Sequence, residues 1–156
     1  MDLFPGELFN LPRRVPNFPH LMVRPLRSTD FEKDWVQLLS QLSPTDHTEE
    51  QYLNRFASLR TASVIGEKLM KFVIVIEDTD SKKLCASASL LVEPKYIRTA
   101  AIGSHVEDVV VHSDYRGKHL GAFITQELVA IAKRVGCYKV CINSSNFWPC
   151  FINNPN

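Results

Sequence analysis

The sequence carries little net charge, no long apolar run and no secretory leader pattern. Eighteen basic and 17 acidic residues leave a formal net charge of +1 over 156 residues, so no strong attraction to nucleic acid or to an anionic membrane surface is expected. No apolar stretch approaches the roughly 20 residues that a membrane-spanning helix needs. The chain does not start with a basic segment followed by an apolar one, so we expect a cytoplasmic protein.

The sequence also lacks the cysteine and histidine spacings that hold metals. Its four cysteines form no C-x-x-C pair and no zinc-finger spacing; they are Cys85, Cys137, Cys141 and Cys150. The histidines between residues 105 and 119 have no metal-ligand spacing either, so no metal site is predicted. Reduced and partly buried thiols fit a cytosolic protein, with a structural disulfide as the alternative.

The length and composition fit one globular domain with two flanking segments. Hydrophobic residues make up 45% of the chain and charged residues 22%, as is usual for a soluble domain. Residues 1–20 contain four prolines, and we expect an extended arm there that lies on the domain or on a partner. Residues 21–143 are expected to form the domain. Residues 144–156 show no clear hydrophobic periodicity, and we expect them to form a divergent tail.

Hydrophobic periodicity predicts the element order β-α-α-β-β-β-α-β. Strands are predicted over residues 21–26, 71–77, 84–93, 105–111 and 137–143. Helices are predicted over residues 28–42, 48–59 and 118–135, where apolar residues recur at helical spacing. Gly136 is a natural stop for the last helix. This order predicts an α/β (α+β) fold in which helices flank a central mixed sheet.

The stretch from His105 to Gly121 is the most informative part of the sequence. A Val-rich strand leads into a glycine-bounded loop, and the loop opens into the long predicted helix. A helix N-terminus presents unpaired backbone N–H groups and a partial positive charge, and therefore receives anions. Gly117 and Gly121 allow a phosphate to approach the backbone, while Arg116 and Lys118 add positive charge. The placement of this loop between strand and helix predicts a phosphate-binding turn.

This arrangement resembles the GNAT superfamily of acetyl-CoA-dependent N-acetyltransferases and, within it, the glucosamine 6-phosphate N-acetyltransferase family. The resemblance covers roughly residues 22–143. Besides residues 105–121, it rests on Val23–Leu26, Leu38–Leu42, Ile76–Asp78, Glu93 with Lys95, and Gly136–Lys139. It implies the GNAT fold, acetyl-CoA as co-substrate without a metal, a homodimer, and acetylation of glucosamine 6-phosphate in the biosynthesis of UDP-N-acetylglucosamine.

The resemblance also implies roles for individual residues. The edge formed by Val109, Val110 and Val111 is expected to pair with the pantetheine arm of acetyl-CoA. The loop expected to wrap the pyrophosphate consists of Arg116, Gly117, Lys118, His119, Leu120 and Gly121. The residues assigned to the sugar phosphate are Ser43, Lys95, Tyr96, Ile97, Arg98, Glu107, Asp108, Val109, Tyr138, Lys139 and Asn143. Of these, Tyr138 and Lys139 are expected to reach the site of a neighbouring subunit.

The chemistry of the reaction fits these residue types. An amine attacks a thioester only when it is neutral, so Glu107 and Asp108 are the candidates for orienting the amine or passing its proton to water. No covalent enzyme intermediate is needed, and therefore Cys85 and Cys137 need not be nucleophiles. Tyr115 is expected to shape the loop, with a catalytic hydroxyl as the alternative.

The sequence departs from the family at its C-terminal end. The family has a carboxylate where this chain has Asn143, and a later tyrosine that protonates the departing thiolate falls near Ile152 or is absent. We therefore expect the sheet to lack its last strand and turnover to be slower. Two other hypotheses remain open. One is a catalytically impaired truncated isoform that binds acetyl-CoA or pairs with full-length subunits, and the other is a transferase for another small amine.

Overall fold

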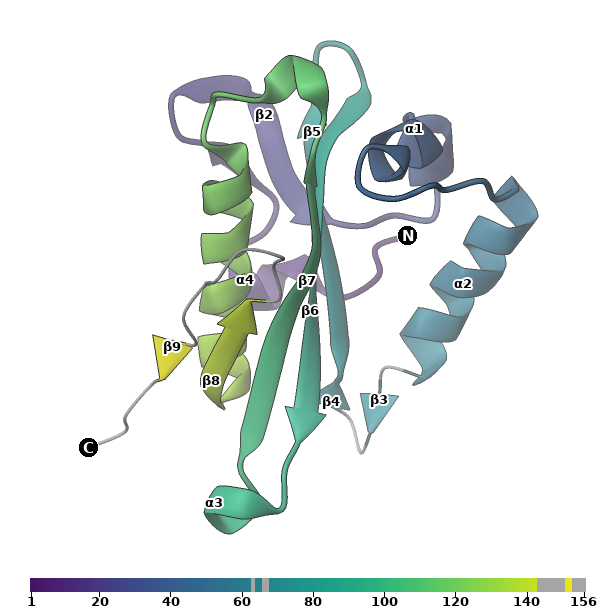
Figure 1. The fold of residues 1–156 in the computed structure, drawn as a ribbon. Helices are drawn as coiled ribbons and strands as arrows, with labels where there is room; N and C mark the ends of the chain where they lie inside the picture. The colour runs from purple at the N-terminus through teal and green to yellow at the C-terminus, as the bar shows by residue number, and fades with distance from the viewer. Residues whose placement is uncertain (63, 66–67, 143–150, 153–156) are drawn as a thin grey trace.

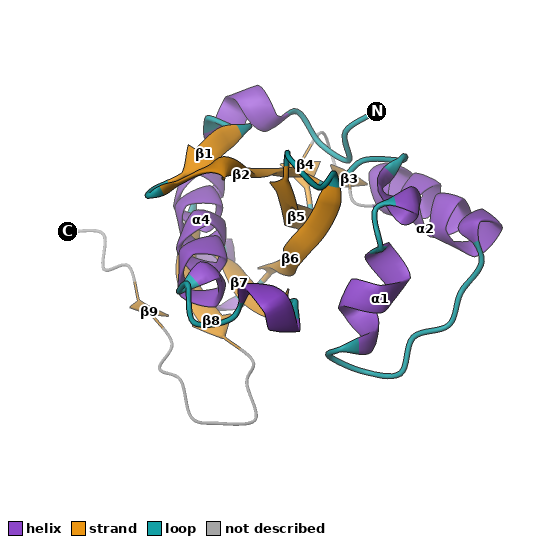
Figure 2. Cartoon of the chain, turned by 90° about the horizontal axis from the view of Figure 1, so that it is seen from above, coloured by secondary structure: helices purple, strands orange, loops and turns teal. Residues whose placement is uncertain are grey.

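A computed structural model describes residues 1–62, 64–65, 68–142 and 151–152 of the chain (Figure 1). Its centre is a mixed sheet with the strand order β1-β2-β5-β6-β7-β8-β9. Neighbouring strands pair antiparallel, except that β7 and β8 are parallel. Helix α4 covers one face of the sheet, and helices α1 and α2 lie on the opposite side (Figures 1 and 2).

The elements have the following bounds. The strands of the sheet are β1 (Arg13–Val15), β2 (Phe18–Pro25), β5 (Lys71–Asp78), β6 (Lys83–Pro94), β7 (Ile102–Val111), β8 (Cys137–Ile142) and β9 (Phe151–Ile152). The helices are α1 (Trp35–Ser40), α2 (Glu49–Ala62), α3 (Ile97–Ala100) and α4 (Leu120–Val135). Short 3₁₀ turns are η1 (Gly6–Phe9), η2 (Asp30–Glu32) and η3 (Ser113–Tyr115), and β3 (Val64–Ile65) pairs with β4 (Lys68–Leu69).

All the predicted helices and strands are present in the predicted order, and the first predicted helix is interrupted. The first predicted helix, over residues 28–42, is split into η2 and α1. Asp34 lies between them with a φ of 61°, a left-handed conformation that does not continue a helix. Its carboxylate pairs with Lys83 at 2.6 Å.

The first 20 residues lie on the domain, as expected of the arm, but they also supply a strand, β1, which was not predicted. This strand fits between Pro12 and Pro16 and lies at the edge of the sheet, where neighbouring prolines remove no ladder hydrogen bond. Four side chains of this segment are buried in the core; they are Leu3, Phe4, Leu11 and Val15. Arg13 Nε donates to Glu127 Oε2 of α4 at 3.0 Å, which ties the segment to the helix.

The opposite edge of the sheet carries a short strand where we expected none. Strand β9 pairs antiparallel with β8 through Lys139↔Ile152 and Val140↔Phe151. The last strand is therefore shortened rather than missing, and the Phe-Ile dipeptide has the aromatic and β-branched character that favours a strand. Asn143 and the rest of the tail, residues 143–150 and 153–156, lie outside the described residues.

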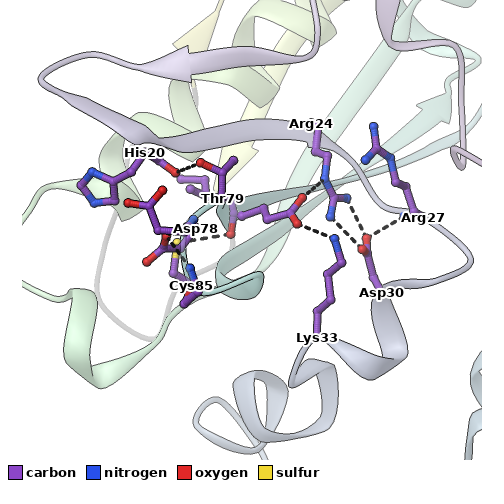
Figure 3. A network of polar contacts seen from close by, with 12 residues as sticks. His20, Arg24, Arg27, Asp30, Lys33, Asp78, Thr79 and Cys85 are labelled. Carbon is purple, nitrogen blue, oxygen red and sulfur yellow. Dashed lines mark hydrogen bonds and ion pairs between the residues drawn. The ribbon is translucent and has the colours of Figure 1, made fainter.

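A buried ion network joins β2 to β5 and to η2 (Figure 3). Arg24 has no exposed surface; its guanidinium donates to both carboxylate oxygens of Asp30, at 2.8 and 2.7 Å, and to Glu77 at 2.7 Å. Lys33 also donates to Glu77. Burial alone lowers the pKa of Arg24, but the two carboxylates outweigh this and raise the pKa overall. The guanidinium therefore stays charged inside the protein.

Candidate active site

A cleft of about 850 Å³ separates the sheet from α1, α2 and the segment that joins them. Sheet residues that line it are Lys71, Val73, Ser87, Ala88, Ser89 and Asp108. Trp35 and Leu39 of α1, Ser43 and His47 of the joining segment, and Gln51 and Arg55 of α2 are among the residues of its walls. Of the predicted site residues, Ser43 and Asp108 are thus brought to one cavity.

A β-bulge in β7 directs Asp108 to this cleft. Ser89 pairs with Glu107 and Ser87 pairs with Val110, so that two residues of β7 lie opposite one of β6. Asp108 has a φ of 54°, in the left-handed region that aspartate tolerates better than most residues. The Ser89 hydroxyl lies 3.2 Å from the Glu107 carbonyl oxygen and 3.4 Å from Asp108 Oδ2. The bulge therefore holds a carboxylate at the cleft.

One edge of the second half of β7 is open. The parallel register with β8 runs only from Ile102↔Cys137 to Val106↔Ile142, and no described strand continues it. The His112 N–H donates to Cys85 O at 2.9 Å, so the antiparallel pattern turns the N–H and C=O groups of Val111 to the side away from β6, where the C=O accepts from Arg116. An extended amide chain, such as pantetheine, can add to such an edge as a strand would.

The predicted phosphate-binding turn follows this edge and is sterically open. Gly117 has a φ of +78°, and a Cβ built on it would meet no atom of the described residues within 4 Å. The next left-handed residue is His119, with a φ of 57°. At the end of the loop, a Cβ on Gly121 would lie 3.6 Å from Val111 Cγ2, so only a small residue leaves this space free.

The start of helix α4 leaves its N–H groups for a ligand. Within the described chain no side chain caps this helix. The Phe123 N–H donates to His119 O at 3.0 Å and is the first to bond back to the loop. Arg116 Nε donates to Val111 O at 3.3 Å, which keeps this cation at the junction of strand edge and loop. The turn therefore offers backbone donors and positive charge to a diphosphate.

The residues predicted to bind the sugar phosphate do not all meet in one place. Lys95, Tyr138 and Lys139 gather around Gly103 at the start of β7, with atoms 3.5, 3.8 and 3.6 Å from a Cβ built there. The Arg98 guanidinium lies over the Tyr138 ring, 5.1 Å from its centroid. We name Lys95, Arg98 and Lys139 the distal cation cluster.

The distal cation cluster lies far from the cleft of the same chain. Gly103 and Asp108 are five positions apart on one strand, which corresponds to about 15 Å. Tyr96 and Ile97, in the same region, are fully and largely exposed. A sugar phosphate whose amine contacts Asp108 is too short to reach these cations within one subunit.

Several residues that line the cleft were not predicted as site residues from the sequence, among them Ser87, Ser89, His47 and Arg55. No motif marks them, because they come together only through strand pairing and helix packing. The one local indication in the sequence was that polar Ser87 and Ser89 alternate with apolar residues, which places both hydroxyls on the same face of the strand. His47 stacks on Tyr52 with ring centroids 6.5 Å apart, which fixes the joining segment on α2.

A bulged strand with one open edge, followed by an uncapped helix that starts at a glycine loop, is the arrangement of the GNAT acetyltransferase fold. The chain belongs to the acetyltransferase (GNAT) family, whose sequence profile matches residues 28–147. Cys85 and Cys137 are both buried, and among the described residues no three His, Cys, Asp or Glu side chains gather as a metal site would require. None of the described helices combines the length and hydrophobicity that crossing a membrane demands.

Curated relatives show which members of that family this chain is similar to. A probable glucosamine 6-phosphate N-acetyltransferase of Drosophila melanogaster is 39% identical over 129 residues, which is 82% of this chain but 56% of the relative. Glucosamine 6-phosphate N-acetyltransferase 1 of Dictyostelium discoideum is 38% identical over 122 residues, 78% of this chain and 74% of the relative. This chain therefore spans little more than half of the Drosophila protein.

A solved structure supports the same relationship. Glucosamine-6-phosphate N-acetyltransferase from Arabidopsis thaliana superposes with a TM-score of 0.74 at 36% identity, covering 80% of this chain and 82% of that protein. The resemblance to this family that the motifs indicated is confirmed by these comparisons.

Two glycines with left-handed backbone conformations allow a direct test of the turn. Gly117 and Gly136 both have positive φ angles and open space around a Cβ. Gly117→Ala and Gly136→Ala should each lower the free energy of unfolding by about 1 kcal/mol. Only Gly117→Ala should weaken CoA binding, by about tenfold, because its methyl group occupies space that the diphosphate needs. Calorimetric titration with CoA measures this, and equal CoA affinity of the two variants would contradict the assignment.

Proposed function

We propose that this chain transfers the acetyl group of acetyl-CoA to the amine of D-glucosamine 6-phosphate, giving N-acetyl-D-glucosamine 6-phosphate and CoA. The observation that carries the proposal is the bulged strand β7. It presents Asp108 to the cleft, and a few residues later it presents an open edge that leads to the phosphate-binding turn. The choice of sugar phosphate rests on the names of the relatives.

The described residues include groups that can perform each step of a direct transfer of the acetyl group from the thioester to the amine. The amine enters as an ammonium ion, and the Asp108 carboxylate in the cleft, with Glu107 beside it, can hold the ion and pass one proton to water. The neutral nitrogen then attacks the thioester carbonyl, which the edge of Val109–Val111 holds in place. A C–N bond forms, the nitrogen gives up its second proton, the C–S bond breaks, and the departing CoA thiolate takes up a proton to become the thiol.

A covalent acyl-cysteine is not part of this mechanism. Cys85 is fully buried, and its Sγ lies 3.2 Å from the backbone oxygen of Ile76. Burial, followed by the negative charge of Asp78, raises the pKa of Cys85 to about 12. The thiol therefore stays protonated and inaccessible. Buried, reduced thiols at Cys85 and Cys137 also support placing the protein in the reducing cytoplasm.

We further infer a homodimer in which the distal cation cluster serves the cleft of the neighbouring subunit. The support is the distance along β7, together with the exposure of Tyr96 and Ile97, large apolar side chains that a partner would cover. The cations Lys95, Arg98 and Lys139 suit a phosphate ester, with which they form charge-assisted hydrogen bonds.

The reaction is tested by release of CoA thiol in the presence of both substrates. We expect turnover with glucosamine 6-phosphate and much weaker turnover with glucosamine, because the amino sugar without phosphate loses the contacts of the distal cation cluster. No thiol release by folded protein would refute the proposal, and equal turnover of both sugars would favour another small amine as substrate. The hypothesis of a catalytically impaired isoform is not favoured by the relatives, which are named as enzymes.

Mixing two inactive variants tests the shared site. Asp108→Asn loses the carboxylate of its own cleft, whereas Lys139→Gln loses a cation offered to the partner. In a mixed dimer, one of the two clefts keeps both groups, so remixed subunits should recover about a quarter of wild-type activity. No recovery after subunit exchange, verified by mass spectrometry of the mixed dimer, would place Lys139 outside the partner's cleft.

A further inference from the structure

A hydrogen bond from the Tyr115 hydroxyl connects the loop proposed to bind the diphosphate to the sheet. Tyr115 ends η3 and directly precedes the loop of residues 116–121. Its hydroxyl donates to Asp78 Oδ2 at 2.6 Å, a contact between residues 37 positions apart. Asp78 is the last residue of β5 and is only 8% exposed. The bond therefore links the start of the loop to a buried point of the sheet.

The Asp78 carboxylate is itself held rigidly. Its other oxygen, Oδ1, accepts the backbone N–H groups of Asp80 at 2.9 Å and Ser81 at 3.3 Å in the turn between β5 and β6. Burial alone raises the pKa of Asp78, but the bonds from Tyr115 and from these N–H groups lower it overall. The carboxylate is therefore ionised near neutral pH, and its bond to the phenol is charge-assisted.

The aromatic ring of Tyr115 also holds a cation of the loop. The Lys118 ammonium lies over this ring, 4.8 Å from its centroid. Between Tyr115 and helix α4, Gly117 and His119 adopt left-handed conformations, which an unfixed loop would populate only in part. One side chain thus fixes both the path of the backbone and the position of a positive charge.

We propose that Tyr115, anchored by Asp78, is a positioning residue that holds the turn of residues 116–121 in the shape that binds the diphosphate of acetyl-CoA. This inference rests on the proposed function, because it names how the same site is kept ready for its ligand. A fixed loop need not become ordered on binding, and that ordering would otherwise weaken the affinity. The phenol does not touch the reacting atoms, so its loss affects donor binding and leaves the acetyl-transfer step unchanged.

Two substitutions at Tyr115 separate the hydroxyl from the ring. Tyr115→Phe keeps the ring beneath Lys118 and removes the bond to Asp78, and it should raise the Kd for CoA by about tenfold. Tyr115→Leu removes both contacts and should raise the Kd further. Thr79→Val is the matched control, because Thr79 lies in the same hairpin and its hydroxyl donates to His20 O at 2.9 Å instead of to the loop. Calorimetric titration of each variant with CoA gives the values.

Kinetics with two acetyl donors distinguishes positioning from general damage. For Tyr115→Phe, the KM for acetyl-CoA should rise by about tenfold while kcat and the KM for the amino sugar stay unchanged. With S-acetylpantetheine, which has no diphosphate, the variant should match the wild type in kcat/KM. An equal loss with both donors would overturn the inference, since it would mean that the phenol supports the fold or the chemistry.

The anchor itself is tested by substitution of Asp78. Asp78→Asn keeps an acceptor for the phenol and should retain most of the CoA affinity, whereas Asp78→Ala should lose about as much as Tyr115→Phe. Tyr115→Phe and Asp78→Ala remove the same hydrogen bond. The double variant should therefore bind CoA no more weakly than either single variant does. Wild-type protein that fails to bind CoA would overturn the proposed function and this inference together. Wild-type binding with unchanged affinity of Tyr115→Phe would overturn the inference alone.

Discussion

Replacement of Asp108 by asparagine is expected to lower kcat by about 10²- to 10⁴-fold, the usual contribution of a positioned acid–base group. The bulge in β7 holds this carboxylate at the cleft, and an amide there cannot balance the ammonium charge or accept its proton. Since asparagine also tolerates a φ of 54°, the backbone should keep its shape. Steady-state kinetics with both substrates measures the loss.

Fold and donor binding serve as internal controls for Asp108→Asn. The melting temperature and the Kd for CoA should stay at the wild-type values, because the open strand edge and the turn are untouched. Asp80 is an exposed carboxylate in the turn between β5 and β6, and as a control Asp80→Asn should leave kcat unchanged. A loss of less than tenfold for Asp108→Asn would remove Asp108 from the chemistry and favour Glu107 as the main carboxylate.

Asp30→Ala is expected to lower the free energy of unfolding by about 3–5 kcal/mol, the usual effect of breaking a buried ion pair from one side. Asp30 has no exposed surface and binds both terminal nitrogens of the Arg24 guanidinium. Without it, the buried guanidinium keeps only Glu77 as a charged partner. Chemical denaturation followed by circular dichroism gives the difference between variant and wild type.

Asp34→Asn provides the comparison on the surface. The Asp34 pair with Lys83 is exposed, with side-chain exposures of 37% and 61%, so its loss should lower the free energy of unfolding far less than Asp30→Ala does. Asparagine also accepts the left-handed backbone of residue 34. Similar losses for Asp30→Ala and Asp34→Asn would show that burial of the Arg24 network has no special energetic weight.

Most of the secondary structure could be predicted because its signals are local. Apolar spacing and Gly136 marked helix α4, and the polar turn between two apolar runs marked the hairpin of β5 and β6. The split of the first helix at Asp34 could not be predicted, since the chain at this point also contacts strand β6, where the Leu84 N–H donates to Lys33 O at 3.0 Å. Strand β1 was missed because the prolines around it indicate a break, whereas at a sheet edge they are tolerated.

The candidate site was predicted in part. The glycine loop and the Val-rich strand were evident, because a phosphate-binding turn is built from consecutive residues. The bulge at Asp108 was not evident, since it depends on the offset between Ser87 and Ser89 in the neighbouring strand. Asn143, predicted to bind substrate, lies outside the described residues.

The sequence by itself determined the order of elements, the glycine loop before helix α4 and the family to which the chain belongs, because periodicity and turn chemistry act over a few neighbouring residues. The tertiary structure decided which carboxylate lines the cleft, where the phenol of Tyr115 is anchored, and how far the distal cation cluster lies from Asp108. These features depend on strand pairing and packing, which bring together residues that are tens of positions apart in the chain.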